Sequence, residues 1–303
     1  MKFEQLEVPQ PVYGTVNVYR IGDTLIDTGH VTEDSRMAMA EALDSGDLAD
    51  VERVVLTHPH IDHVGGSQTV PELAALPHVV FEGVPSIITD FRRYLERVHE
   101  EIHERSVGLA GDRSAIDESY FPIDDYAEDD IQVGRVVGDG ETIRLGEYSC
   151  EVIHTPGHSE QQMALWHTDS RTMFSADLVS TNGHFMYGPL YGDVGSYIDS
   201  LQRLRTYDAD RLVPGHGPVI SNPTKRIEEA LEKTRTAMSG IKTAVATTND
   251  RITASQLAKE VFEATAETIG FLTLVVCEYL EYLEDENEVV VSHTEDGIFA
   301  ASS

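Results

Sequence analysis

Cysteine and long apolar runs are scarce in this chain of 303 residues. Its two cysteines, Cys150 and Cys277, are too few for the disulfide framework of a small secreted protein. The longest apolar run, residues 271–277, is far shorter than the roughly 20 residues that cross a bilayer. Residues 1–5 lack the basic and apolar regions of a signal peptide. We therefore expect a soluble, cytoplasmic protein with no membrane partner.

Lysine is also scarce: five lysines and 17 arginines stand against 53 acidic residues, which gives a formal net charge of −31. Like charges at this density repel one another in dilute buffer, whereas multimolar salt shortens the Debye length to a few ångströms. The acidic residues spread over the whole chain instead of forming a tail. We therefore expect a halophilic protein, with an acidic mesophilic protein as the alternative.

One stretch, residues 57–66 (THPHIDHVGG), concentrates the metal-binding side chains His58, His60, Asp62 and His63. It follows residues 51–56, a short β-branched segment that predicts a buried strand ending in a loop. Imidazole suits zinc and iron(II), and a carboxylate adds charge. His58 and His60 suit one ion, while Asp62 and His63 suit a second. Four ligands do not complete two sites, so the pattern predicts further ligands downstream.

Three further candidates, His158, Asp177 and His216, each follow an apolar or strand-like stretch. The order His-x-His-x-Asp-His, then His, Asp and His, resembles the metallo-β-lactamase superfamily of hydrolases over about residues 12–219. The resemblance implies two zinc ions per chain, with iron or manganese as alternatives, and a bridging role for Asp177. It assigns metal one to His58, His60 and His158, and metal two to Asp62, His63 and His216. It also implies that Asp27 supports the ligand loop without binding metal.

Other polar residues carry separate expectations. His184 and Tyr187 lie on the loop after Asp177, so we expect them to contact substrate, with loop packing as the alternative. His154 is expected to orient the loop that carries His158. His78 has no ligand motif around it and is expected to be structural or exposed.

Residues 1–221 are expected to form one α/β domain in which strands and helices alternate loosely. Strands are expected at residues 12–19, 24–27, 51–56, 142–145, 148–153, 163–167 and 172–175, and helices at 32–45 and 195–207. Two such series predict two stacked sheets flanked by helices, which agrees with the αββα sandwich of the metallo-β-lactamase superfamily. The insertion at residues 85–134 contains apolar residues at helical spacing between 87 and 102. We expect one amphipathic helix there, as a lid over the substrate or as a packing or dimer element.

Residues 222–303 are expected to form a second, smaller domain. A charged helix at 225–246, a helix that opens with residues 253–258, another at 268–284 and a terminal hairpin predict a winged-helix-like unit. Such units often bind DNA, but residues 252–303 hold eleven acidic residues and a single basic residue, Lys259. Phosphate binding relies on basic residues, so a structural role or a homodimer contact is favoured. The tail nevertheless resembles that of β-lactamase-like endoribonucleases.

Three functions remain open on this basis. Two neighbouring cations lower the pKa of a shared water to about 7 and polarise a carbonyl or phosphoryl oxygen, so hydrolysis is expected. Asp62 is expected to hold that water, and Asp177 to balance the charge. The leading hypothesis is hydrolysis of a small ester or thioester, because the ligand set is similar to that of glyoxalase II. The alternatives are a single-strand RNA endonuclease, which the charge disfavours, and a sulfur dioxygenase with one iron.

Overall fold

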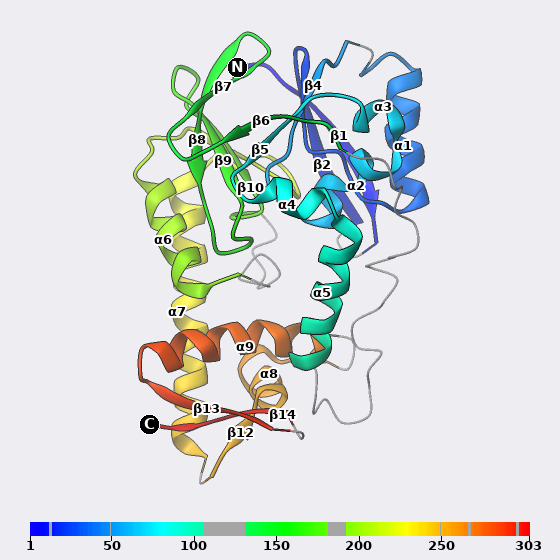
Figure 1. The fold of residues 1–303 in the computed structure, drawn as a ribbon. Helices are drawn as coiled ribbons and strands as arrows, with labels where there is room; N and C mark the ends of the chain where they lie inside the picture. The colour runs from blue at the N-terminus through cyan, green and yellow to red at the C-terminus, as the bar shows by residue number, and fades with distance from the viewer. Residues whose placement is uncertain are drawn as a thin grey trace.

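The computed structural model describes residues 1–11, 14–48, 50–105, 131–180, 192–248, 250–265, 268–294 and 297–303, without the side chains of residues 99 and 101–105. Two β-sheets stack face to face, helices cover their outer faces, and a smaller C-terminal unit lies beyond one edge of the sheets (Figure 1). The α/β sandwich that we expected from the sequence is confirmed.

The first sheet has six strands in the order β1-β2-β3-β4-β5-β6. The pairs among β1 to β3 are antiparallel, whereas the pairs from β3 to β6 are parallel. The bounds are β1 (Glu4–Gln10), β2 (Gly14–Ile21), β3 (Thr24–Ile26), β4 (Arg53–Val55), β5 (His78–Phe81) and β6 (Val133–Val137). Because β3 and β4 are parallel, the residues that follow them meet at one edge of the sheet.

The second sheet has five strands in the order β11-β10-β9-β8-β7, and only the β10–β11 pair is parallel. The bounds are β7 (Thr142–Leu145), β8 (Tyr148–His154), β9 (Met163–His167), β10 (Thr172–Ala176) and β11 (Arg211–Pro214). Every residue of β9 and β10 is buried, as expected for strands covered on both faces. Leu165 and Phe174 pack into the core shared with the first sheet, while Trp166 and Met173 pack on the helical side.

Helices close the two outer faces of the sandwich. On the first sheet, α1 (Glu33–Asp44) inserts Met39 into the shared core. On the second sheet, α6 (Val194–Arg205) and the first half of α7 (Pro223–Thr247) contribute Leu201 and Leu231. α7 begins where the Asn222 side chain accepts a hydrogen bond from the backbone N–H of Lys225, directly before a proline. The remaining short helices here are α2 (Ile61–Thr69), α3 (Pro71–Ala74) and α4 (Val84–Ile88).

Two local predictions were wrong. The metal-binding motif does not lie wholly on a loop, because α2 begins at Ile61 and places Asp62 and His63 in its first turn. The carbonyl of His60 accepts the backbone N–H groups of His63 and Val64, at 3.0 and 3.1 Å, and so starts that helix.

The single helix expected between residues 87 and 102 is two helices, α4 and α5 (Phe91–Arg105). Asp90 starts the second one: its carbonyl accepts the Tyr94 N–H at 3.0 Å and its carboxylate accepts the Arg93 N–H at 3.3 Å. Further along, α5 reaches α9 of the same chain (Figure 1). This contact shows that α5 packs against another part of the same chain. The alternative prediction, a lid over the substrate, also concerns residues 106–130, which lie outside the described residues.

The C-terminal unit has a hydrophobic core of its own. It comprises β12 (Ile252–Thr253), α8 (Ala254–Phe262), α9 (Ile269–Asp285), β13 (Val289–Thr294) and β14 (Gly297–Ser302). Its strands form a sheet in the order β12-β14-β13. The second half of α7 packs into this core through Ile241 and Val245, so one helix belongs to both parts. Division of the chain at residues 221 and 222 therefore stays a prediction.

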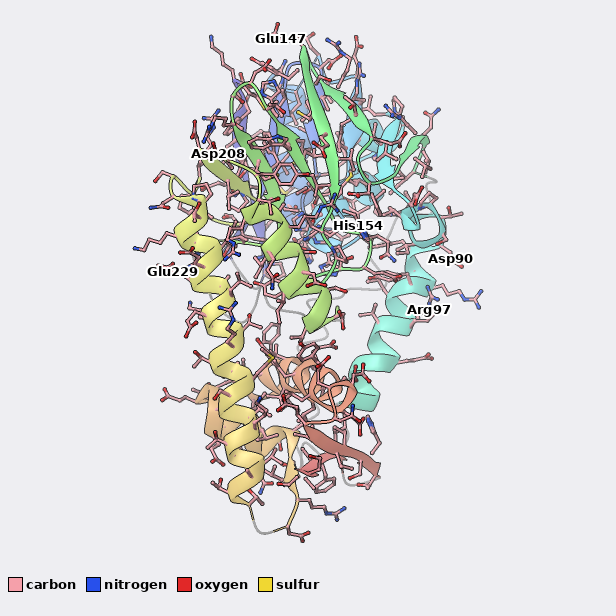
Figure 2. All side chains as sticks on the ribbon, turned by 90° about the vertical axis from the view of Figure 1, so that its left-hand side faces the viewer. Asp90, Arg97, Glu147, His154, Asp208 and Glu229 are labelled. Carbon is pink, nitrogen blue, oxygen red and sulfur yellow. The ribbon has the colours of Figure 1, made fainter. Side chains whose placement is uncertain are left out.

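Charged ends of side chains surround both parts of the molecule (Figure 2). His154 and Glu147 mark the two ends of the β7–β8 hairpin in that view: Glu147 lies at the far tip, and His154 lies toward the C-terminal unit. Within the described ranges, no helix is both long and apolar enough to cross a membrane.

Candidate metal centre

All seven ligand candidates follow strands that end at the same edge of the sandwich. His58 and His60 come after β4, and Asp62 and His63 open α2 directly behind them. The others come from the second sheet, where His158 follows β8, Asp177 follows β10 and His216 follows β11. Because the two sheets are stacked, the loops from both meet above one edge of the core.

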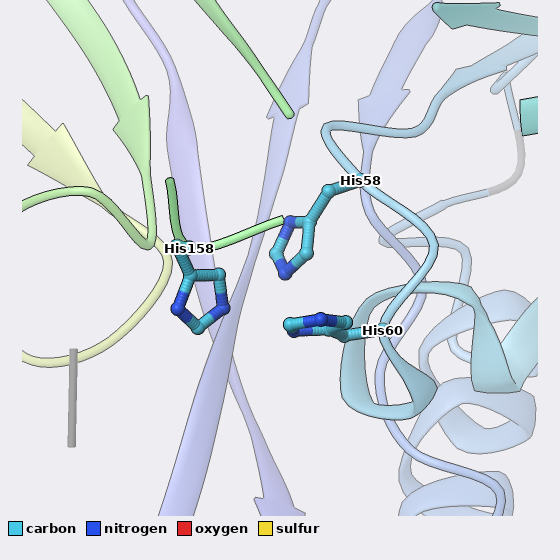
Figure 3. A group of neighbouring side chains, drawn as sticks. All are labelled: His58, His60 and His158. Atoms are coloured by element: carbon cyan, nitrogen blue, oxygen red, sulfur yellow. The ribbon is translucent and has the colours of Figure 1, made fainter. Parts of the chain in front are cut away.

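The structure brings the seven side chains together. Their donor atoms form three overlapping groups, and the atoms of each group lie within 4.8 Å of one another. The groups are His58, His60 and His158; His58, His63 and Asp177; and Asp62, His63 and His216. The first group faces inward from opposite sides, with His58 and His60 from one loop and His158 from the other (Figure 3). All seven are buried except His60, which is half-buried.

The donor atoms suit a metal better than a hydrogen-bonded core. Nε2 of His58, both ring nitrogens of His158 and Oδ1 of Asp177 are buried, yet make no hydrogen bond within the described part of the chain. Buried polar atoms normally have such partners. Nitrogen and carboxylate donors grouped in threes match the sites that hold zinc and similar divalent cations. The residues present therefore fit metal binding.

Electrostatics divides the histidines into two kinds. Burial lowers the pKa of His58 and His158 and lowers that of His60 to about 3, with neighbouring imidazoles adding to the effect. These three rings are therefore neutral and offer a lone pair. Burial also opposes charge on His216, but Asp177 and Asp62 outweigh it and raise the pKa of His216 to about 10. Asp177 is the largest of the charges that raise the pKa of His63.

The two carboxyls show the reciprocal effect. Burial alone raises the pKa of Asp62 and of Asp177, yet the charges of His63 and His216 bring both below the ordinary value. Nε2 of His216 lies 3.2 Å from an oxygen of each carboxylate. A cation bound among these groups takes the place of the imidazole protons, so binding releases protons.

Two polar groups outside the cluster, the Asp27 carboxylate and the Thr15 carbonyl, fix how the rings of His63 and His216 point. Asp27 accepts hydrogen bonds from the N–H and the hydroxyl of Thr57, and pairs with Nδ1 of His63, all at 2.8 Å. Nδ1 of His216 donates to the Thr15 carbonyl at 2.8 Å, which leaves Nε2 facing the cluster. Such outer contacts set the tautomer and orientation of a ligand imidazole. Asp27 has a left-handed backbone, with φ of 60°, which turns the chain into the site.

Close packing at the site explains why residue 215 is a glycine. A Cβ atom on Gly215 would overlap Oδ1 of Asp177 and would lie 2.9 Å from Cε1 of His63. Any side chain at this position displaces ligand atoms, so glycine is required for reasons of space.

Sequence reasoning missed the residues that hold the loop around His216. Asn17 and Tyr19 of β2 both donate side-chain hydrogen bonds to the Pro214 carbonyl, at 3.0 and 2.6 Å. Burial raises the pKa of Tyr19, so its hydroxyl keeps the proton that it donates. The available indication was an asparagine within the otherwise apolar strand segment VNVY. His184 and Tyr187, expected to contact substrate, lie outside the described residues.

Residues 12–216, more than half of the chain, match the sequence profile of the Metallo-beta-lactamase superfamily. The chain belongs to the metallo-beta-lactamase superfamily. The Bacillus subtilis protein named probable metallo-hydrolase YqjP is 30% identical over 307 residues, which cover 96% of this chain and 94% of that protein. The protein is therefore a metallo-hydrolase of this superfamily, as expected.

Two further similarities extend the comparison. An atrochrysone carboxyl ACP thioesterase of Passalora fulva is 27% identical over 270 residues, or 84% of this chain and 66% of that protein. The crystal structure of a metallo-beta-lactamase family protein from Thermus thermophilus superposes with a TM-score of 0.78 at 22% identity. It covers 99% of this chain and 98% of the other, so the similarity in fold includes the C-terminal unit.

Proposed function

We propose that this metallo-hydrolase cleaves a small ester or thioester and uses two zinc ions per chain. The observation that carries the proposal is the pair of separate triads, His58-His60-His158 and Asp62-His63-His216, with Asp177 beside both. When bound, two such cations supply a water with a pKa near 7 and a Lewis acid for the carbonyl oxygen of the substrate. A ligand set complete for both positions is what this chemistry needs.

The protein side chains then have distinct roles. Neutral His58, His60 and His158 would hold the first ion, and Asp177 would balance positive charge between the two positions. The Asp62 carboxylate, whose pKa is held low by His63 and His216 against the effect of burial, is ionised at neutral pH. In this proposal it would orient the attacking water by accepting a hydrogen bond from it. Asp27 orients His63 so that its Nε2 faces the triad with Asp62 and His216.

Charge supports a small substrate over a nucleic acid. The chain carries a net charge of −31, and a polyanion depends on basic residues for its affinity. The named thioesterase among the relatives is consistent with a thioester. The resemblance of the C-terminal unit to a winged helix favours RNA cleavage instead, and the exposed Arg92 and Arg93 on α5 are the basic residues that such a substrate would require. RNA cleavage is therefore the second candidate.

The deciding experiment combines metal analysis with three substrates. Protein purified in concentrated salt is assayed by mass spectrometry for metal, and against an acyl thioester, a p-nitrophenyl ester and a single-stranded RNA. We expect about two zinc ions per chain, and turnover of the thioester or ester that falls about 100-fold or more in Asp62→Ala. Asp47→Ala, which removes an exposed carboxylate, is the matched control and keeps full activity.

Each other result has a definite meaning. Cleavage of the RNA without turnover of either acyl substrate replaces the proposal with the endonuclease. One iron per chain removes the two-ion mechanism and indicates the sulfur dioxygenase. Equal activity of Asp62→Ala and the unaltered protein shows that the cluster is not the catalytic site. Gel filtration of the same samples tests the proposal of a homodimer.

A further inference from the structure

Asn17 is a polar residue in the middle of a buried strand. Only 1% of it is exposed, and its neighbours Val16 and Val18 are buried in the core shared by the two sheets. Burying an amide without hydrogen bonds costs a few kcal/mol, so the partners of such a group define its role. Here the Asn17 amide oxygen accepts a hydrogen bond from Nε2 of Gln5 at 2.9 Å. The amide nitrogen points the other way, out of the first sheet.

The amide nitrogen of Asn17 joins the first sheet to a ligand loop of the second. It donates to the Pro214 carbonyl at 3.0 Å and to the Gly217 carbonyl at 2.8 Å. These two carbonyls stand on either side of His216 in the chain. The backbone N–H of Asn17 donates to the carbonyl between them, Gly215, at 2.7 Å. One residue therefore contacts the loop at three carbonyls around a single metal-ligand candidate.

The arrangement is available because β2 is only partly paired on that side. β3 pairs with residues 19–21 of β2, so the backbone at residues 15–17 is open to the loop. Thr15 uses this opening as well, since its carbonyl accepts Nδ1 of His216 at 2.8 Å. The position of Nε2 of His216, 3.2 Å from both Asp62 and Asp177, thus depends on contacts made by β2.

We propose that Asn17 is a positioning residue for the second metal position, the triad of Asp62, His63 and His216. The inference rests on the proposed function, because it requires two ions. It is specific to one of them: within the described part of the chain, the Asn17 side chain forms hydrogen bonds with Gln5 and with the loop around His216, and with none of the loops that carry His58, His60 and His158. Loss of the two amide donors frees the loop around His216, while the first triad keeps its geometry.

The test measures metal binding at each position in four variants. Asn17→Ala removes the amide, and Asn17→Asp keeps its shape but replaces the donors with oxygen. The added negative charge of the second variant by itself favours cations, so weaker binding there reports geometry. Gln5→Ala removes only the partner of the amide oxygen. Val18→Ala opens a cavity in the same strand and serves as the control for general destabilisation.

Zinc dissociation constants are obtained by competition with a chelator, and the visible spectrum of the cobalt(II)-substituted protein distinguishes the two positions. We expect both Asn17 variants to bind the first ion as the unaltered chain does and the second ion about 10- to 100-fold more weakly. Val18→Ala should lower the melting temperature without changing the dissociation constant of the second zinc ion. Gln5→Ala should leave that dissociation constant within about twofold of its value in the unaltered protein.

The outcomes separate the two proposals. Two tightly bound ions in Asn17→Ala overturn the role of Asn17 and leave the two-ion function intact. The role is also overturned if both ions weaken equally, or if Val18→Ala weakens the second ion as much as Asn17→Ala. A single ion in the unaltered protein overturns the two-ion function, and the role of Asn17 with it.

Discussion

Buried histidines in this protein take their charge state from their immediate neighbours, and His78 shows the effect of burial without a carboxylate nearby. Its ring is fully buried between Ser67 and Leu76. Nδ1 donates to the Leu76 carbonyl at 2.8 Å, and Nε2 lies 2.8 Å from the Ser67 hydroxyl. Burial lowers the pKa of His78 to about 4, so the folded protein holds this ring neutral. As expected, His78 is structural.

His78 should make the protein sensitive to acid. The unfolded chain takes up a proton at this ring near pH 6.5, whereas the folded chain does so near pH 4. Stability contributed by the neutral ring is therefore complete above pH 6.5 and declines as the pH falls toward 4, by about 3 kcal/mol in all. We expect the free energy of unfolding of His78→Gln, measured by urea denaturation, to fall less over this pH range than that of the unaltered protein. The prediction is contradicted if the free energy of unfolding falls equally with pH in His78→Gln and in the unaltered protein. His293→Gln, at an exposed position, is the control.

At this scale the sequence indicated the ligands and, through the family resemblance, the supporting role of Asp27, but not the residues that hold the loop around His216. His58, His60, Asp62 and His63 could be recognised because a metal motif is a local pattern after a strand. The contacts of Asn17 join residues 197 and 200 positions apart, and no local pattern encodes such a pair. Only the presence of an amide in an apolar strand indicated that some partner must exist.

Among the elements, α8 begins with a complete capping box. The Thr253 hydroxyl accepts the backbone N–H of Gln256 at 3.1 Å, and the Gln256 side chain accepts the N–H of Thr253 at 2.9 Å. Both contacts satisfy N–H groups that a helix start leaves without an intrahelical partner.

We expect Thr253→Ala to lower the free energy of unfolding by about 1 kcal/mol, because one helix-end donor loses its acceptor. Urea denaturation followed by circular dichroism, at a constant concentration of potassium chloride, measures the change in the free energy of unfolding. Glu260→Ala, at an exposed position of the same helix, should stay within about 0.5 kcal/mol of the unaltered protein. If the two variants lose equal stability, the cap makes no special contribution.

Some elements were predicted with nearly their observed bounds, whereas the strands β1, β5 and β6 and the break between α4 and α5 were not predicted. The helix expected at 225–246 is α7 (Pro223–Thr247), and the strand expected at 163–167 is β9 (Met163–His167). The break between α4 and α5 was missed because apolar spacing continues across it. The second helix starts where the Asp90 carboxylate accepts the Arg93 N–H. From sequence alone, an Asp within an amphipathic pattern is equally compatible with an exposed position inside one continuous helix.

For the whole molecule, charge is the dominant surface property. Basic residues lie among several acids: Arg20 is within 4 Å of Glu4 and Asp50, and Arg171 is within 4 Å of Asp208 and Asp210. These pairs are exposed on the acidic side and add little stability each. Most of the 53 acidic residues have no basic residue to balance them, because only 22 are available. Dissolved salt would screen their mutual repulsion.

The proposal of halophily gives a measurable expectation. We expect the melting temperature to rise by roughly 10 °C between 0.1 and 3 M potassium chloride, which corresponds to about 3–5 kcal/mol of reduced repulsion. Differential scanning calorimetry measures the shift. Sucrose is the control, because it is excluded from the protein surface without screening charge. A melting temperature that is constant in salt, or that rises equally in sucrose, contradicts adaptation to high salt.

The continuity of α7 has a mechanical consequence. This helix of 25 residues is about 37 Å long, and its two halves lie in different hydrophobic cores. A helix that packs into a hydrophobic core at each end resists bending, because bending would break backbone hydrogen bonds in its interior. Movement of the C-terminal unit away from the second sheet would therefore require α7 to bend between its two halves.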